Sequence, residues 1–305
     1  MKHLRILAGT LGAGLLVLTA GAAGACTLQT VGELSVDLSR RAPIVDGEIN
    51  GVKVKIMIDT GSSTTIIAGP VAATLGLTAG KKTPGGYVFG EGDTYSTIPR
   101  SLKIGTFTST DLPPFLVGDA IPGEPDVAML VGADFLSQFD VEFDLADNMI
   151  RLFRAEGCTA PQLVYWNKPY SQAALAPGNQ FETDVALNGR RVLAAIDTGA
   201  STSRVDAGTA AGAGEANPAP GRAWNAEFAS LAIGDESIAH ARIEVADFDV
   251  SDTGTRVGRH GGLPSMLIGE DFLHAHRVMI DSKNQVMVFS YSGGPIFSTP
   301  AATQP

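Results

Sequence analysis

Two copies of the tripeptide Asp-Thr-Gly constrain this chain more than any other feature. The first ends the run Ile-Met-Ile-Asp-Thr-Gly at residues 56–61, and the second ends Ala-Ala-Ile-Asp-Thr-Gly at residues 194–199. Apolar residues that run into an acidic residue, a hydroxyl and a glycine are typical of a strand that ends in a tight turn. Each turn offers one carboxylate, and we expect the fold to bring Asp59 and Asp197 together.

The surroundings of the two tripeptides repeat as well. Asn-Gly pairs at 50–51 and 188–189 stand at the same spacing before each aspartate. Asn-Gly between strand-like runs predicts a hairpin. A second shared block, an apolar run followed by glycine and the acidic start of a helix, recurs at 129–136 and 266–273. The repeat therefore predicts two β-rich units with short helices.

The expected domain organisation follows from the repeat and from the segments outside it. Its boundaries are a signal peptide at 1–25, an N-terminal arm at 26–43, a first unit at 44–155, a linker at 156–177, a second unit at 178–292 and a disordered tail at 293–305. The signal peptide is predicted from a basic head, an uncharged run and small residues at its end. An uncleaved membrane anchor is the alternative, because about 20 uncharged residues are long enough to cross a bilayer.

The chain has two cysteines, Cys26 and Cys158. Cys26 directly follows Ala23-Gly24-Ala25, which resembles a bacterial lipobox and would make the protein an envelope lipoprotein whose lipid on Cys26 contacts the membrane. A disulfide between the two cysteines is the other reading, since an exported chain with an even cysteine count permits one. Both alternatives place the protein in the periplasm or the cell envelope.

Charge and residue spacing exclude several other classes. The formal net charge of −10 argues against nucleic acid or an anionic membrane surface as a partner, since both need basic patches. His274 and His276 stand two residues apart and would not share one face of a helix, so a metal site is not expected there. We expect neither a metal nor a cofactor.

Two carboxylates a few ångströms apart have a specific chemistry. They cannot both ionise cheaply, so they share one proton. The ionised member can take a proton from a water held between them, and the protonated member can donate to a carbonyl oxygen. Gly61 and Gly199 remove side chains where the two turns must pack closely. This arrangement predicts the attack of water on an amide bond.

With these residues the chain resembles the aspartic peptidases of the retropepsin and pepsin group, in particular the bacterial retropepsin-like proteins. The resemblance is carried by both Asp-Thr-Gly turns and by the apolar blocks that end at Gly132 and Gly269. It implies an all-β fold of two pseudo-symmetric acid-protease lobes, with Asp59 and Asp197 as the catalytic dyad at the lobe junction. Because both copies stand in one chain, we expect a monomer.

The resemblance also implies which residues support the dyad. Thr60 and Thr198 would form hydrogen bonds across the lobe junction and hold the two aspartates rigid. Gly61, Ser62 and Gly199 would complete the two turns. The second copy departs from the first at Ala200, which stands in place of Ser62.

A flap is implied by the same resemblance. The hairpin from Tyr87 to Tyr95, with Gly90 and Gly92 at its tip, would close over a peptide or protein substrate bound in an extended form. The corresponding segment of the second copy is shorter, so we expect an asymmetric cleft covered mainly by the first unit.

The function expected from these features is that of an exported aspartic endopeptidase that processes an envelope protein. Two alternatives stay open at this point: a catalytically inactive pseudo-protease that binds peptides, and a structural envelope lipoprotein. The substrate, its cleavage site, the pH optimum and control by a pro-segment or a partner do not follow from the sequence.

Overall fold

The computed structural model describes residues 25–40, 42–78, 80, 82–83, 94–118, 121, 123–178, 180–216, 218, 222–246 and 264–297. Within them strands predominate, and each α-helix spans four to six residues. The prediction of an all-β fold with short helices is confirmed. Residues 1–24 of the predicted signal peptide lie outside this part of the chain. None of the helices described is long and apolar enough to span a membrane.

The first copy is built around a tight hairpin and a parallel strand. The antiparallel strands β2 and β3 are joined by Asn50 and Gly51, which both have positive φ, as a two-residue turn of this type requires. β10 lies parallel to β3 and antiparallel to β4. The elements are β2 (Ile44–Ile49), β3 (Val52–Ile58), β4 (Ile66–Ala68), α1 (Gly69–Ala72), β5 (Lys82–Thr83), β6 (Thr94–Thr97), β7 (Leu102–Ile104), β8 (Phe107–Ser109), β9 (Phe115–Gly118), β10 (Val127–Val131) and α2 (Ala133–Leu136).

The second copy repeats this plan. Asn188 and Gly189 join β14 to β15 with positive φ at both residues, and β19 lies parallel to β15 and antiparallel to β16. Its strands close into a barrel in the order β14-β15-β19-β16-β18-β17. The elements are β14 (Glu182–Leu187), β15 (Arg190–Ile196), β16 (Arg204–Val205), α4 (Ala207–Gly212), β17 (Trp224–Ile233), β18 (Glu236–Val245), β19 (Met266–Ile268) and α5 (Glu270–Ala275).

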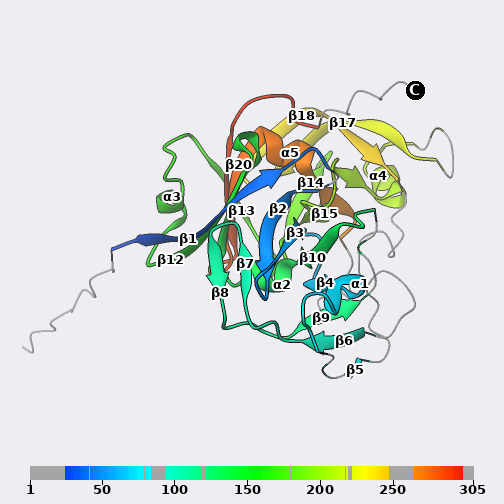
Figure 1. Cartoon of the computed structure of the whole chain (residues 1–305). Helices are drawn as coiled ribbons and strands as arrows, with labels where there is room; N and C mark the ends of the chain where they lie inside the picture. Colours follow the sequence, from blue (N-terminus) through cyan, green and yellow to red (C-terminus); the bar gives the residue numbers. More distant parts are fainter. Residues whose placement is uncertain are drawn as a thin grey trace, which may run out of the picture.

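A shared sheet joins the two copies, and its strand order is symmetric. The order β13-β21-β20-β11-β12-β1 places β11 of the first copy antiparallel to β20 of the second. If each strand is replaced by its counterpart in the other copy, the same list of strands is obtained in reverse order. In Figure 1 the ends of the two copies, with β6 and β9 on one side and β17 and β18 on the other, lie on opposite sides of the molecule. The elements are β1 (Thr27–Asp37), β11 (Asp140–Asp144), the 3-10 helix η1 (Leu145–Asp147), β12 (Met149–Glu156), α3 (Ala160–Leu163), β13 (Ser171–Ala174), β20 (His276–Asp281) and β21 (Val286–Tyr291).

The structure corrects several expected elements. The apolar pattern at 141–153 and 278–291 predicts one final strand in each copy, but the structure has a hairpin of two strands there, β11–β12 and β20–β21. The segment 156–177, expected as a linker, contributes β13 to the shared sheet by pairing with β21. The arm at 26–43 contributes β1, which pairs with both β12 and β2. Strand pairing with distant segments therefore recruits both connecting segments into the sheet.

The helices and the tail also differ from the sequence patterns. Pro70 near the start and Gly76 near the end of an apolar run predict a fuller helix in the first copy, yet α1 spans four residues and α4 six. The Asp206 side chain caps α4 by accepting from the Thr209 N–H, whereas no side chain caps α1. Packing continues past the expected end at 292, because Phe297 is buried against Phe272. Residues 298–305 of the tail lie outside the described residues.

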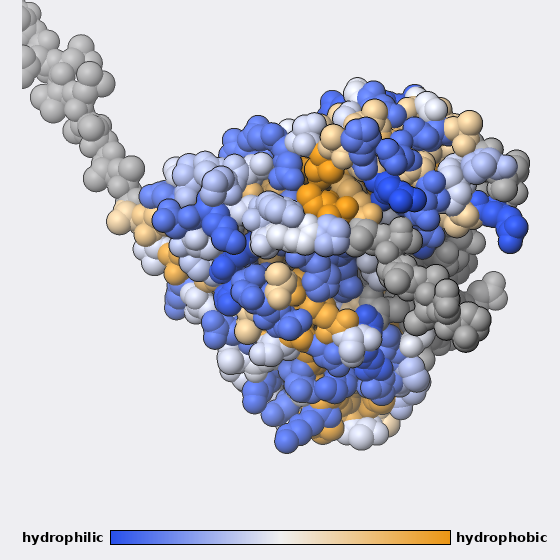
Figure 2. All heavy atoms as spheres, turned by 90° about the horizontal axis from the view of Figure 1, so that it is seen from above, coloured by the Kyte–Doolittle hydropathy of each residue, from blue (hydrophilic) through white to orange (hydrophobic). Residues whose placement is uncertain are grey.

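One hydrophobic cluster runs through both copies. It contains the residues that precede each turn, including Ile58 and Ile196, and core residues of the shared sheet such as Phe143 and Val278. Fully burying an aliphatic or aromatic side chain of this size contributes about 1.5–3 kcal/mol, so the cluster holds the two copies in one fold. The face seen in Figure 2 is mainly hydrophilic, with hydrophobic residues in small separate patches.

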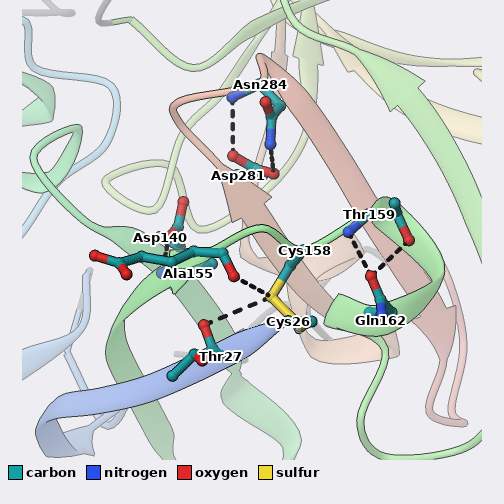
Figure 3. The surroundings of a disulfide bond; sticks show 10 residues. Cys26, Thr27, Asp140, Ala155, Cys158, Thr159, Gln162, Asp281 and Asn284 are labelled. Carbon is teal, nitrogen blue, oxygen red and sulfur yellow. Dashed lines mark hydrogen bonds between the residues drawn. A yellow bond between two sulfur atoms is a disulfide. The ribbon is translucent and has the colours of Figure 1, made fainter. Parts of the chain in front are cut away.

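A disulfide joins Cys26 to Cys158. It ties the beginning of β1 to the segment that follows β12, close to Asp140 and Asp281 of the shared sheet (Figure 3). Of the two alternatives for Cys26, the structure contains the disulfide. A sulfur in a disulfide has no valence left for a thioether to a lipid.

Candidate active site

The first Asp-Thr-Gly turn begins where β3 ends. The Asp59 N–H donates to Val131 O at 3.0 Å, which holds the aspartate against the end of β10. Its carboxylate turns back onto its own loop, where Oδ1 accepts from the main-chain N–H groups of Gly61 at 2.9 Å and Ser62 at 3.1 Å. Charge-assisted bonds of this kind fix the orientation of a carboxylate.

The second turn has the same construction. The Asp197 N–H donates to Ile268 O at 2.9 Å at the end of β19. Asp197 Oδ1 accepts from the Gly199 N–H at 2.9 Å. Asp197 is buried and Asp59 is partly exposed. The two aspartates therefore reach equivalent positions by equivalent local bonds.

Two threonines lock the turns to each other. The Thr60 N–H donates to Thr198 Oγ1 at 3.0 Å, and the Thr198 N–H donates to Thr60 Oγ1 at 2.9 Å. Each hydroxyl in turn donates across the junction, from Thr60 to Ile196 O at 2.7 Å and from Thr198 to Ile58 O at 2.8 Å. Both residues are buried, so each of these four bonds satisfies groups that water does not reach. Thr60 and Thr198 therefore bond to each other and to the opposite strand across the junction of the two turns.

The glycines bring the two carboxylates to the same place. A Cβ atom on Gly61 would lie within 3.0 Å of the Asp197 carboxylate, and a Cβ on Gly199 would lie 2.7 Å from Asp59 Oδ1. Real Cβ atoms do not approach other atoms so closely. Each carboxylate therefore lies directly against the glycine of the opposite turn, and any side chain at either glycine would displace it.

A second set of hydrogen bonds links each turn to the helix that follows in the same copy. Its two hydroxyl residues, Thr65 and Ser203, were not predicted from the sequence. Thr65 Oγ1 accepts from the Gly132 N–H at 3.0 Å and donates to Asp134 Oδ1 at 2.6 Å. Ser203 Oγ accepts from the Gly269 N–H at 2.9 Å and donates to Asp271 Oδ1 at 2.6 Å in the second copy. The signal was present, because a hydroxyl residue stands at the same distance after each Asp-Thr-Gly.

An acidic residue at the start of each helix predicts a capping role for Asp134 and Asp271, but Gly132 and Gly269 occupy the N-cap positions. Each aspartate is the second residue of its helix and accepts from the next main-chain N–H, that of Phe135 or Phe272. Burial raises the pKa of Asp271, although its bonds from Ser203 and from the main chain act in the opposite direction. Through the bonds from Thr65 and Ser203, Asp134 and Asp271 link α2 and α5 to the segments that follow the two turns.

Ser62 and Ala200 mark a difference between the turns. The Ser62 hydroxyl donates to Thr64 O at 2.9 Å and accepts from the Thr64 N–H at 3.4 Å. Its main-chain N–H is the group that bonds to Asp59. Ala200 has no hydroxyl for the local bond. The Ser62 hydroxyl therefore constrains the first turn in a way that Ala200 cannot reproduce in the second.

The residues predicted for the flap tip, Tyr87, Gly90 and Gly92, lie outside the described part of the chain. The base of that hairpin is described: Lys82 pairs with Tyr95, and Thr83 pairs with Thr94. β6 pairs with β9 in the antiparallel direction, and β9 pairs in parallel with β4, the strand that follows the first turn. β5 and β6 are thus attached, through β9 and β4, to the sheet that holds Asp59.

The described residues contain no group of three or more His, Cys, Asp or Glu side chains that could hold a metal ion. Glu270 is the first residue of α5 and follows the N-cap Gly269. Burial, and then the charges of Asp271 and Asp197, raise its pKa to about 8.

Comparison with known families adds to this geometry. Residues 45–138 match the gag-polyprotein putative aspartyl protease family. The predicted resemblance to retropepsin-like aspartic peptidases is thereby confirmed, and the match supports a general aspartic protease function, which is that of a hydrolase. No curated protein matches the chain. The retropepsin-like segment includes Asp59 and the block at Gly132 but ends before Asp197, so the second turn is related to the first by the repeat and by the bonds described above.

Proposed function

We propose that this protein is an exported aspartic endopeptidase that hydrolyses peptide bonds with Asp59 and Asp197. The observation that carries the proposal is the reciprocal approach of each carboxylate to the glycine of the other turn. The buried Thr60–Thr198 bonds support it, because they prevent the two turns from separating. A site held in one geometry before the substrate arrives lowers the cost of reaching the transition state.

The proposed reaction uses one water and two carboxyl groups. The ionised carboxylate removes a proton from the water, and the water oxygen bonds to the carbonyl carbon of the peptide. The carbonyl oxygen takes the proton of the other carboxyl group, which gives a neutral tetrahedral diol. The diol collapses, the C–N bond breaks, and a proton passes to the leaving nitrogen. The products are a carboxylic acid and an amine, and the pair ends with one proton, as it began.

The proposed substrate is an extended stretch of a protein. An extended peptide offers main-chain donors and acceptors to a strand or hairpin beside it. β5 and β6 form an antiparallel pair at the edge of the sheet that follows the first turn, and an edge strand offers such donors and acceptors. This arrangement favours cleavage within a chain over cleavage at its end.

Export and an envelope substrate are also part of the proposal. The disulfide between Cys26 and Cys158 supports export, because disulfides persist in oxidising compartments such as the periplasm. The signal sequence predicted for residues 1–25 points to the same compartment. Limited processing of another envelope protein is the proposed task. Its check is a comparison of envelope protein fragments from cells with the wild-type protein and cells with Asp59→Asn.

The central test replaces each aspartate by asparagine in the purified protein. Asp59→Asn and Asp197→Asn retain the shape of the side chain but cannot share a proton, so cleavage of a mixture of unstructured peptides is expected to fall at least ~10³-fold in each. Asp111→Asn, an exposed residue, is the matched control and should cleave like wild type. A chelator should leave the rate unchanged. Cleavage that survives either central substitution would overturn the proposal, and peptide binding without cleavage by the wild type would favour a pseudo-protease.

A further inference from the structure

The second copy has a carboxyl group at a position where the first copy has a methyl group. Glu270 begins α5, and Ala133 begins α2 at the equivalent place. The Glu270 N–H donates to Ala200 O at 2.8 Å, and the Ala133 N–H donates to Ser62 O at 2.8 Å. Both residues are therefore bonded directly to the turn that carries an aspartate, but only Glu270 has a side chain that can ionise.

The Glu270 side chain is buried without a full set of partners. The residue is 6 % exposed, and its Oε1 atom has no hydrogen-bond partner within the described part of the chain. Burying an unpaired carboxylate is far more costly than burying a neutral carboxylic acid. A group of this kind therefore favours its protonated form, and perturbed acids beside two other carboxyl groups are frequent at functional sites.

Among the residues that the structure describes, the charged groups that act on Glu270 are acidic. They are Asp271, its neighbour in α5, and Asp197 in the turn after β15. α5 also packs against η1, β11, β19 and β20. Charged side chains on these elements bond elsewhere or are exposed. Asp140 accepts from the Ala155 N–H, Asp281 accepts from Asn284, and Asp147 is exposed. Glu142 and Asp144 pair with Arg151 and Arg277, and His276 bonds to Glu236. Ionised Glu270 would thus face two like charges.

We propose that Glu270 is a positioning residue for Asp197: as a neutral acid it fills the space behind the second turn, and as an anion it repels Asp197 and loosens that turn. The proposal rests on the function proposed for Asp197. Ala133 cannot ionise, so the first turn lacks this additional response to pH. The protein would then lose activity at alkaline pH through the second turn.

The first experiment follows stability against pH in the full-length protein. The pKa of Glu270 is raised from 4.5, its ordinary value in an unfolded chain, to about 8 in the folded protein. Between these two pH values the folded state holds a proton that the unfolded state has lost. Stability from this group therefore falls as pH rises through the window. The Tm of Glu270→Gln minus that of wild type should be near zero at pH 4.5, grow to several degrees by about pH 8, and then stay constant.

Two matched variants sharpen this measurement. Glu270→Ala installs the residue of the first copy and should give the same pH-dependent gain as Glu270→Gln. Ala133→Glu installs the acid behind the first turn and should give a loss that grows over the same pH range. A Tm difference that does not change with pH in Glu270→Gln and Glu270→Ala would overturn the proposal.

The second experiment tests the coupling to Asp197. Infrared difference spectroscopy between wild type and Glu270→Gln reports the carbonyl stretch of a protonated carboxylic acid, which should be present at pH 6.5 and disappear near pH 8. In an Asp197→Asn background the band should disappear at lower pH, because one of the two repelling charges is gone. Asp59→Asn is the matched substitution in the first turn and should move the band less. Equal shifts in both backgrounds would overturn the assignment to Asp197.

The third readout is turnover, and it separates this proposal from the proposed function. kcat/KM of Glu270→Gln should lie within about twofold of wild type at pH 5 and exceed it at pH 8. If the wild type cleaves no peptide while the Tm and infrared titrations behave as described, the peptidase proposal fails and the link between Glu270 and Asp197 stands. If cleavage is normal but the titrations are absent, only the proposal for Glu270 fails.

Discussion

At the scale of single residues, the site depends on groups that are small and buried. Thr60 and Thr198 each donate and accept across the junction, and both lie where water does not reach them. A hydroxyl is needed for this exchange, and a methyl group of the same size cannot replace it. The chemistry of the dyad is thus linked to two side chains that take no part in the proposed reaction.

Removing one of these hydroxyls should destabilise the protein and slow it. Thr198→Val keeps the volume but leaves the Thr60 N–H and Ile58 O without partners, which should cost about 2–5 kcal/mol of unfolding free energy. The proposed cleavage should fall by roughly 10–100-fold, because small displacements of reacting groups are costly. Thr198→Ser retains the hydroxyl and should stay near wild type. Denaturant titration and initial rates check both, and equal behaviour of the Val and Ser variants would contradict the argument.

Much at this scale could be predicted from the sequence, but not all of it. The aspartates, glycines and threonines of the turns are visible as a tripeptide that occurs twice. Thr65 and Ser203 were missed because a hydroxyl six residues further along has no meaning until the chain folds back onto Gly132 or Gly269. The proposed role of Glu270 could not be predicted, because it depends on the burial of this side chain near Asp197. No local sequence pattern indicates that burial.

At the scale of elements, each turn is held by a helix that starts within van der Waals distance of it. A Cβ atom on Gly132 would lie 2.7 Å from the carbonyl carbon of Thr64, and a Cβ on Gly269 would lie 2.6 Å from Ala200 O. Both clashes are with main-chain atoms, which cannot rotate away. Glycine is therefore required at the start of α2 and α5 by close approach, since both have negative φ.

Substituting these glycines should separate helix from turn. Gly132→Ala and Gly269→Ala are each expected to cost about 2–4 kcal/mol, because the main chain must move to make room. Gly208→Ala is the matched control: it lies inside α4, its Cβ would meet only the end of the Asp206 side chain, and alanine in a helix is favoured over glycine by about 1 kcal/mol. Thermal unfolding of the three variants compares them directly. A stable Gly269→Ala variant would show that the contact is not tight.

Elements were predictable where local chemistry determines them. The Asn-Gly hairpins of β2–β3 and β14–β15 formed where expected, because the turn type selects those residues. Helix length was not predictable in the same way, since the Asp206 cap of α4 outweighed its glycine content. The pairing of β1 and β13 with strands far away in sequence depends on which edges are free after the rest has folded.

At the scale of the whole molecule, the two copies meet in the pairing of β11 with β20. At this seam Asp140 and Asp281 come from different copies, and both are buried. Asp140 accepts from the Ala155 N–H at 2.7 Å, and Asp281 accepts from Asn284 at 2.9 Å and 2.7 Å. Burial, and then the charge of Asp281 and its hydrogen bond, raise the pKa of Asp140 to about 6 against the opposing bonds from the main chain. The seam therefore contains a carboxyl pair outside the proposed site.

This pair gives the seam a pH dependence with a definite sign. The pKa of Asp140 is raised from 3.8 to about 6, so the folded protein holds a proton in this range that the unfolded chain has released. The stabilising contribution is complete below pH 4 and is lost as pH rises toward 6. Asp140→Asn cannot ionise, and its amide can still donate toward Asp281. The variant should match wild type at pH 4 and exceed it at pH 7 by on the order of 1–3 kcal/mol.

Measuring the free energy of unfolding at pH 4, 5, 6 and 7 tests this expectation for the junction as a whole. Asp147→Asn is the control, because Asp147 is exposed in η1 and its loss should leave the pH dependence unchanged. The pH range of the effect also distinguishes the seam from the second turn. The stability gain of Asp140→Asn over wild type should stop growing near pH 6, whereas the gain of Glu270→Gln should grow until about pH 8. If Asp140→Asn differs from wild type by the same amount at every pH, the seam carries no shared proton, and the junction relies on strand pairing and apolar packing alone.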